Sequence, residues 1–258
     1  MSVQNENAEQ SSAPEMATPV WVGSPIHSAS REDLLRVAAD PYLTEDLALA
    51  LLKRADLPPE ILEQWAKNGN VLKLRKVKVA LVCHPRAPRH VSVPLARQFY
   101  TFDLLRVALS SSVPADVKVA ADEMLIARLK TVTLGERLSL ARRASGRVAG
   151  SLLLDGETRV MRTALENSRL TEAFVIQAVL RPQASVVLVQ TVARHTKWSY
   201  RREVRIALLR TEFLSLARAL EFSHGLPPPF LREVLQTSRL PARIKEQLLR
   251  QCHRPSSP

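Results

Sequence analysis

The stretch Leu170-Thr171-Glu172-Ala173-Phe174 decides the fold, because its pattern returns along most of the chain. In each copy an apolar residue is followed by Pro, Thr or Ser, then by two variable residues and a second apolar residue. We call this pattern the repeat motif. Its copies are Leu43-Thr44…Leu47, Leu57-Pro58…Ile61, Ala87-Pro88…Val91, Val113-Pro114…Val117, Leu170-Thr171…Phe174, Ala184-Ser185…Leu188, Leu226-Pro227…Phe230 and Leu240-Pro241…Ile244.

The spacing of the repeat motif is regular. Intervals near 14 residues separate positions 43 and 57, 170 and 184, and 226 and 240. Intervals near twice that length separate 57 from 87 and 87 from 113, and Ala144-Ser145…Val148 is a degenerate copy in the same register. A fixed period of this size is typical of stacked structural repeats, in which each unit buries its apolar stripe against the next.

The residues that follow each copy favour helices. Pro is tolerated in the first turn of a helix, and Ser or Thr caps its free N–H groups. Apolar residues at helical spacing predict helices at about 90–98, 102–110, 115–130, 134–144, 147–154, 158–166, 171–180, 185–194, 199–209, 212–222, 228–236 and 241–251.

One segment, residues 71–83, fits two structures. Its β-branched residues and their alternation suit a strand. Leu74, Val77 and Leu81 also share one helical face, and the motif copy at Ala87 suits a helix that ends near His84. We favour a helix here.

Composition limits the class of protein. Hydrophobic residues make up 46% of the chain, whereas only 7 of its 258 residues are glycine, which argues against Gly-rich phosphate loops. Two cysteines cannot provide a disulfide framework for this length. The polar stretch from Met1 to Pro19 lacks the features of a secretory signal, and no apolar run is long enough for a membrane helix. We therefore expect a cytoplasmic protein without membrane insertion.

Charge is distributed unevenly along the sequence. The net charge is +12, but residues 1–68 contain 5 Lys or Arg and 11 Asp or Glu, whereas residues 69–258 contain 32 and 14. An acidic front followed by a strongly basic body indicates an acidic partner for the body.

Three groups of basic residues are the candidate binding surface. Guanidinium and ammonium groups beside an indole can bind carboxylates, phosphates or a stacked base. The groups are Lys73, Arg75, Lys76 and Lys78; Arg142, Arg143 and Arg147, with Arg159, Arg162 and Arg169 following; and Arg194, Lys197, Trp198, Arg201, Arg202 and Arg205. The alternative is that these charges are spread around the body and serve solubility.

The third group allows a more detailed prediction. For a helix that opens at Ser199, Tyr200 and Val204 belong to the buried face, whereas Arg201, Arg202 and Arg205 lie on the opposite side. The structural alternative is a solvated helix face, with Trp198 filling the join between repeats.

Catalytic and metal-binding patterns are missing from the sequence. The six histidines show no HxxxH or HExxH spacing, and there is no GxSxG, Walker or GxGxxG motif. His84, Asn167 and His195 each follow an expected helix, where a polar side chain can bond the last carbonyls or the next loop. We interpret Asp155-Gly156-Glu157 as a turn and Asp122-Glu123 as a solvated helix face.

The chain resembles two families of helical repeats over about residues 40–250. Alternating helices with Pro or Thr at each start resemble HEAT-like repeats. The shorter units, such as Val160 to Leu180 with Ala164-Leu165-Glu166-Asn167, resemble the leucine-rich-repeat variant family. This resemblance implies an all-α, right-handed α-solenoid that acts as a binding surface. Some HEAT-like proteins bind DNA, including the alkylpurine DNA glycosylases, but no residue motif of those enzymes is found here.

The complete prediction is therefore as follows. Residues 1–28 form a disordered acidic tail, residues 29–252 a helical repeat domain, and residues 253–258 a frayed end. The function is a non-enzymatic scaffold, without cofactor or metal, that presents a basic surface to an acidic protein partner. The first alternative is nucleic-acid binding through the same basic ridge, and the second is an enzyme of the glycosylase type.

Overall fold

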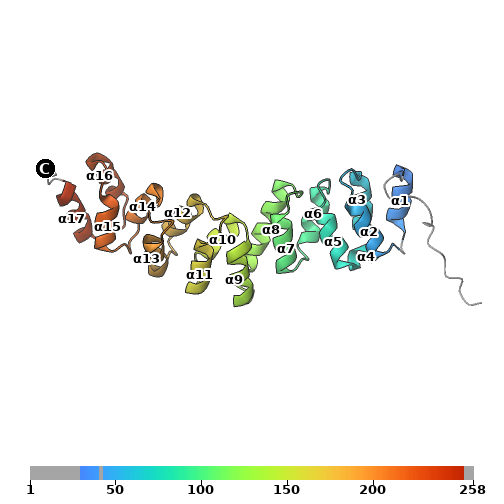
Figure 1. Cartoon of the computed structure of the whole chain (residues 1–258), viewed down its shortest axis with the longest axis horizontal. Helices are drawn as coiled ribbons and strands as arrows, with labels where there is room; N and C mark the ends of the chain where they lie inside the picture. Colours follow the sequence, from blue (N-terminus) through green and yellow to red (C-terminus); the bar gives the residue numbers. More distant parts are fainter. Residues whose placement is uncertain (1–29, 41–42, 253–258) are drawn as a thin grey trace, which may run out of the picture. The chain divides into compact units, whose positions relative to one another are not determined.

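The computed structural model describes residues 30–40 and 43–252, and every regular element in these ranges is a helix (Figure 1). The predicted tail, residues 1–28, and the predicted frayed end, residues 253–258, lie outside the described residues. The chain divides into two compact units, residues 1–80 and residues 81–258, which we call unit 1 and unit 2. The all-α class is thus confirmed.

Unit 1 contains the first helices. They are α1 (Arg31–Ala39), α2 (Glu45–Leu52), α3 (Pro59–Lys67), α4 (Gly69–Lys73) and α5 (Arg75–Val82), whose last two residues belong to unit 2. The segment 71–83 is therefore helical, as we favoured, although the helix breaks at Leu74. Helix α3 packs against both α1 and α4.

Unit 2 contains the remaining twelve described helices. They are α6 (Arg89–Ala96), α7 (Thr101–Leu109), α8 (Ala115–Arg128), α9 (Leu134–Arg143), α10 (Gly146–Leu152), α11 (Thr158–Leu165), α12 (Glu172–Leu180), α13 (Val186–Arg194), α14 (Arg202–Leu209), α15 (Leu216–Ser223), α16 (Pro228–Gln236) and α17 (Ala242–Cys252). Except for the starts of α14 and α15, which lie three and four residues later than expected, these bounds lie close to the helices expected from the sequence.

The second residue of the repeat motif marks where helices begin. Pro58, Pro88, Pro114 and Pro227 are the N-cap residues of α3, α6, α8 and α16. Where the motif has a hydroxyl residue, it often caps directly: Ser185 Oγ accepts a hydrogen bond of 3.1 Å from the Leu188 N–H. The first residue of the motif is buried in most copies, for example Leu57, Val113 and Leu170.

Helices in unit 2 contact their next or next-but-one neighbours along the chain. One row consists of α6, α8, α10, α12, α14 and α16, each in contact with the following member. A second row contains α9, α11 and α13, again in contact one after the other. The two rows alternate in Figure 1. Buried side chains such as Leu140, Leu152 and Leu188 come from both rows and form a core that extends from one helix to the next.

Helices α10 and α12 of the same row approach closely where α10 contains glycine. A Cβ atom at Gly146 would overlap the carbonyl oxygen of Arg169, and one at Gly150 would lie 2.9 Å from the Cβ atom of Phe174. Residues without a side chain are required at both positions, because α10 packs directly against the start of α12.

Polar side chains join helices that lie far apart in the sequence. The last carbonyl groups of a helix have no partner within that helix and must be satisfied by other donors. Asn167 Nδ2 donates to the carbonyl groups of Ala141 (2.8 Å) and Ala144 (3.1 Å). Ser238 Oγ donates to the Leu209 carbonyl at 2.6 Å, and Asn68 Nδ2 donates to the Asp40 carbonyl at 3.2 Å. These donors lie 23 to 29 residues after their acceptors, close to twice the 14-residue interval of the repeat motif.

Candidate binding surface

The first basic group lies on α4 and α5 in unit 1 and is partly used for internal contacts. Lys73 Nζ donates to Asn70 Oδ1 at 3.3 Å. Lys76 Nζ lies 2.9 Å from Glu45 Oε1, and the hydrogen bond to this carboxylate raises the pKa of Lys76. The two other members, Arg75 and Lys78, are exposed and half-buried, respectively. This group belongs to a different unit from the other two.

Trp198 is not on the surface of the third group. Its side chain is only 2% exposed, and its indole N–H donates a 3.0 Å hydrogen bond to the Leu165 carbonyl at the end of α11. Lys197 Nζ lies 4.2 Å from the centre of the indole ring and remains exposed. Trp198 thus fills the join between α11 and the turn that follows α13, which was our structural alternative, and its ring is not accessible to a stacked base.

The expected burial of Tyr200 is wrong. Helix α14 begins at Arg202, three residues later than we expected, because residues 196–200 form turns. The helical periodicity that placed Tyr200 beside Val204 therefore does not apply, and Tyr200 is 74% exposed. Val204 is fully buried as expected.

Arg205 also differs from the other arginines of its group. Its Nε atom donates to the Ser199 carbonyl at 2.6 Å, and its guanidinium lies 5.4 Å from the centre of the Phe222 ring. Arg205 is half-buried and holds the turn against α14 and α15. By contrast, Arg194, Arg201 and Arg202 are exposed.

The residues of the second group separate in space. Arg142 and Arg143 end α9, and both are exposed. Arg147 lies on α10, in the other row, where its guanidinium pairs with Glu123 at 3.6 Å and lines a cavity of about 310 Å³ with Gly150 and Arg181. Residues that are neighbours in sequence therefore serve different faces of unit 2.

Two grooves open between helices of unit 2. One lies between α7 and α9, has a volume of about 700 Å³, and is lined by Phe102, Leu105, Arg106, Leu109, Ser110, Ser111 and Arg143. The other lies between α11 and α13, has a volume of about 550 Å³, and is lined by Arg162, Thr163, Glu166, Val187, Gln190, Thr191, Arg194 and His195. Each groove therefore contains two arginines and at least one apolar side chain. We call them the α7–α9 groove and the α11–α13 groove.

Sequence reasoning did not single out Arg106. It stands alone among apolar neighbours in α7 and belongs to no cluster of basic residues. One feature of the sequence could have identified Arg106: it lies in the last turn of its helix. The other helices with a basic residue at that position include α9 with Arg142 and Arg143, α11 with Arg162 and α13 with Arg194. The helix dipole favours cations near the C-terminus of a helix, so an arginine at this position also stabilises its own helix.

The polar residues after helices have structural roles, as predicted. Nδ1 of His84 accepts a hydrogen bond from the Arg86 N–H (3.2 Å), and Nδ1 of His195 accepts one from the Lys197 N–H (3.1 Å). The side-chain oxygen of Asn167 accepts one from the Arg169 N–H at 2.8 Å. Within the described residues, no group of three or more His, Cys, Asp or Glu side chains could hold a metal ion.

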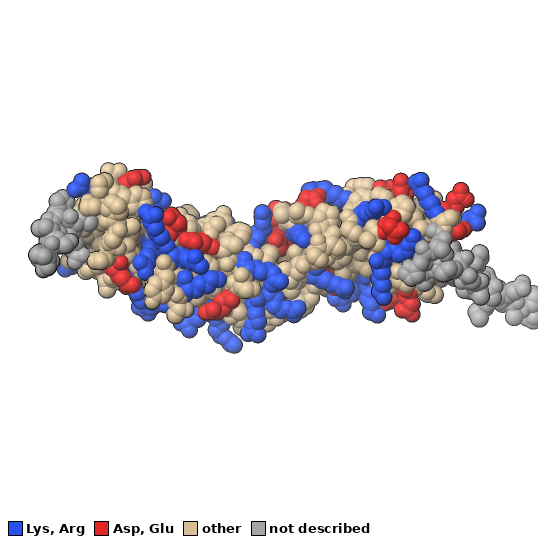
Figure 2. Space-filling model, turned by 45° about the horizontal axis from the view of Figure 1, so that its top comes forward, with Lys and Arg blue, Asp and Glu red and all other residues tan. Residues whose placement is uncertain are grey.

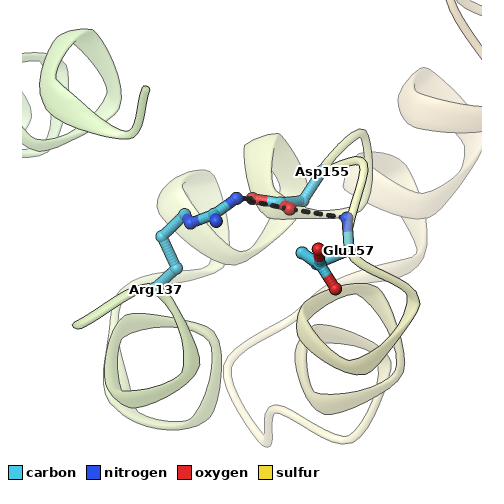
Figure 3. A network of polar contacts seen from close by, with 3 residues as sticks. All are labelled: Arg137, Asp155 and Glu157. Atoms are coloured by element: carbon cyan, nitrogen blue, oxygen red, sulfur yellow. Dashed lines mark hydrogen bonds and ion pairs between the residues drawn. The ribbon is translucent and has the colours of Figure 1, made fainter. Parts of the chain in front are cut away.

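Asp155 organises a turn, which confirms our interpretation of that segment. Both of its carboxylate oxygens accept from Arg137 Nη1, at 2.7 and 2.8 Å, and Oδ1 also accepts from the Glu157 N–H at 2.9 Å. Figure 3 shows Arg137 and Asp155 facing each other across this turn. The carboxylate of Asp155 thus joins α9 to the start of α11.

Asp122 is not the solvated residue that we expected. It is 6% exposed and faces α10, because the buried face of α8 runs through Val117, Ala121, Asp122 and Leu125. Burial raises the pKa of Asp122, whereas a hydrogen bond from Ser145 and the charge of Arg147 act in the opposite direction. Its neighbour Glu123 is exposed as predicted.

Unit 2 carries a large excess of positive charge. It contains 28 Lys or Arg and 14 Asp or Glu. Figure 2 shows one face, on which Lys and Arg side chains of unit 2 form broad groups interrupted by separate Asp and Glu side chains. Such a surface attracts anionic partners over distances of about 10 Å at 0.1 M salt.

Comparison with known proteins gives no relative: no protein-family model, curated protein or solved structure matches the chain. Among the described helices, none combines the length and the apolar character needed to cross a lipid bilayer.

Proposed function

We propose that the chain is a non-enzymatic scaffold, built as a right-handed α-solenoid of HEAT-like repeats, whose unit 2 binds an acidic partner protein through exposed arginines. The observation that carries this proposal is the state of Arg143, Arg194, Arg201 and Arg202. All four are exposed, and no ion pair joins them to an acidic residue in the part of the chain that the structure describes.

The arginines of unit 2 are of two kinds, those paired with an acidic residue of the chain and those without such a pair. Other guanidinium groups of unit 2 have acidic partners within the chain, as in the ion pairs of Arg89 with Asp116 (2.8 Å) and Arg137 with Asp155 (2.7 Å). The chain therefore contains arginines that its own acids satisfy and others that they leave available. Because a guanidinium forms bidentate hydrogen bonds with carboxylates, the available ones suit an acidic protein surface.

Nucleic acid is the alternative partner, and one observation favours it. Tyr200 is 74% exposed and directly precedes the exposed Arg201 and Arg202, an arrangement that can stack a base and contact its phosphate. The buried indole of Trp198 removes the other aromatic group of this turn from such a role. We therefore keep the acidic protein as the proposed partner.

The test is a pull-down from the native cell with two matched variants. In the first, Arg143, Arg194, Arg201 and Arg202 are replaced by Glu; in the control, the exposed Arg31, Arg36, Lys53 and Lys67 of unit 1 are replaced by Glu. Both variants change the net charge equally. Bound proteins and nucleic acids are quantified with and without nuclease, at low and high salt.

We expect a protein partner that survives nuclease, elutes at high salt, and is lost only from the first variant. Equal loss from both variants would show that net charge alone is responsible, and would contradict the proposal. Loss of all captured material after nuclease treatment would replace the acidic protein with nucleic acid.

A further inference from the structure

Residues from the C-terminal ends of helices line both the α7–α9 groove and the α11–α13 groove. In the α11–α13 groove, Glu166 follows the end of α11 and His195 follows the end of α13, and His195 Nε2 lies 3.1 Å from Glu166 Oε1. In the α7–α9 groove, Arg143 from the end of α9 lies with Ser110 and Ser111 from the end of α7. The helices of each pair therefore run parallel, with their C-terminal ends together.

Each groove combines two available arginines with an apolar wall. Arg106 and Arg143 line the first groove, and Arg162 and Arg194 line the second. All four are exposed, and none forms an ion pair with an acidic residue among those described. The apolar side chains include Phe102, 47% exposed, in the first groove and Val187, 45% exposed, in the second. Large apolar side chains at this level of exposure inside a groove can pack against an apolar group of a ligand.

We propose that these two grooves bind one extended acidic segment of a partner protein, in which apolar side chains alternate with carboxylates. The proposal rests on the proposed function and identifies where on unit 2 the partner lies. The guanidinium pairs bind the carboxylates, and the walls formed by Phe102 and Val187 receive the apolar side chains. Because α9 contacts α11, a segment that follows the C-terminal ends of α7, α9, α11 and α13 passes both grooves.

The apolar walls distinguish this ligand from nucleic acid. A phosphate backbone would be attracted by the four arginines but would leave the exposed Phe102 and Val187 without an apolar partner. Glu166, whose side chain is 75% exposed at the α11–α13 groove, repels anions and so limits the number of carboxylates that this groove accepts. An alternating segment satisfies both the arginines and the apolar walls, whereas a uniformly charged polymer satisfies only the arginines.

The experiment measures binding of a fluorescent peptide of about 16 residues in which Glu and Leu alternate. A peptide of the same charge with Ser in place of Leu, and a single-stranded oligonucleotide, serve as comparison ligands. In one variant of the full chain, Arg162 and Arg194 are replaced by Gln. In the control variant, the exposed Arg97 and Arg243 of unit 2, which line neither groove, are replaced by Gln. Circular dichroism verifies that each variant is folded.

We expect the Glu-Leu peptide to bind the parent chain more tightly than the Glu-Ser peptide, by about tenfold. Arg162→Gln with Arg194→Gln lowers this affinity by about tenfold, and the control variant by less than about threefold. Glu166→Gln raises the affinity, because it removes a repulsive charge while keeping an oxygen that can accept from His195. A gain of affinity cannot result from unfolding.

Each opposite result would overturn the inference. An equal loss of peptide affinity in the two arginine variants would mean that the attraction is spread over unit 2. The grooves would then not be the binding site, while the pull-down would still decide the proposed function. Equal affinity for the two peptides would remove the role of the apolar walls. If the oligonucleotide binds more tightly than the Glu-Leu peptide, and this binding is lost when Arg162 and Arg194 are replaced, the α11–α13 groove is a nucleic-acid site. Failure of the parent chain to bind either peptide would also reject the inference, while the pull-down decides the proposed function separately.

Discussion

The turn between α13 and α14 and the α11–α13 groove are neighbours that use basic residues differently. In the turn, the sequence places Lys197, Trp198 and Arg205 close together, yet Trp198 is buried and Arg205 holds the turn through the Ser199 carbonyl. In the groove, Arg162 and Arg194 are far apart in the sequence, and the packing of two helices brings them to one opening. Basic and aromatic residues that are close in sequence can thus form a joint between packed helices, whereas an available surface is built from residues of different helices.

The largest effect should come from breaking the joint. Trp198→Ala removes a fully packed indole and leaves the Leu165 carbonyl without its donor, which together should lower the free energy of unfolding by about 3–5 kcal/mol. The shift of the urea unfolding midpoint measures this loss. Trp198→Phe keeps most of the apolar volume and should lose less. An unchanged midpoint for Trp198→Ala would mean that the indole serves binding rather than packing.

The second effect compares two joints of the same kind in units 1 and 2. Asn167 is 1% exposed and donates at 2.8 and 3.1 Å, whereas Asn68 is half-buried and donates at 3.4 and 3.2 Å. We expect Asn167→Ala to lower the free energy of unfolding by about 2–3 kcal/mol, and Asn68→Ala by about 1 kcal/mol, because buried groups lose more when a partner is removed. Chemical denaturation of both variants gives the order. The reverse order would show that burial does not determine the strength of these joints.

The elements that sequence predicts well are those with local causes. The repeat motif places an N-cap residue before a helix, and capping depends only on residues within one turn. The starts of α3, α8 and α13 therefore follow directly from Pro58, Pro114 and Ser185. The same reasoning favoured a helix for residues 71–83, since the helical spacing outweighed the β-branched content.

The failures of the sequence prediction arise where distant residues decide. Tyr200 and Trp198 are both aromatic and lie two positions apart, yet Trp198 is buried with its indole N–H on the distant Leu165 carbonyl, whereas Tyr200 is exposed. Asp122 is buried because α10 packs over it, although a charged residue beside Glu123 is typical of a solvated face. Arg106 and Arg143 line the same groove because α7 and α9 lie on either side of it, and no local spacing in the sequence predicts this.

A third, smaller effect concerns the buried carboxyl of Asp122. The groups that face it are Ser145 and Arg147 from α10, and Glu123 lies beside it. Because burial raises the pKa of Asp122 in the folded state, the folded state binds a proton more tightly than the unfolded state does. The stabilisation from this proton is complete below the ordinary pKa of the carboxyl and is lost as the pH rises through the raised value.

Asp122→Asn should therefore raise the urea midpoint at neutral pH and flatten its dependence on pH above about 4. The gain should be smaller than the loss from Asn167→Ala, since the hydrogen bond from Ser145 and the charge of Arg147 already offset part of the cost of burial. Midpoints measured from pH 4 to pH 8 give both quantities, at values chosen around the ordinary carboxyl pKa. A lower midpoint for Asp122→Asn at neutral pH would mean that the charged form stabilises the interface of α8 and α10.

The smallest expected effect on stability is that of Tyr200→Ser, which changes an exposed residue next to the buried Trp198 joint. Tyr200→Ser changes an exposed side chain two residues from Trp198, so the free energy of unfolding should change by less than about 0.5 kcal/mol. Its guanidinium neighbour, Arg205, keeps its contacts with the Ser199 carbonyl and the Phe222 ring. Affinity for the Glu-Leu peptide should also stay the same, because Tyr200 lines neither groove. A loss of oligonucleotide affinity by about 1–3 kcal/mol, without a change in stability, would instead give Tyr200 a base-stacking role. In that case the exposed turn, rather than the grooves, would be the surface that selects the partner.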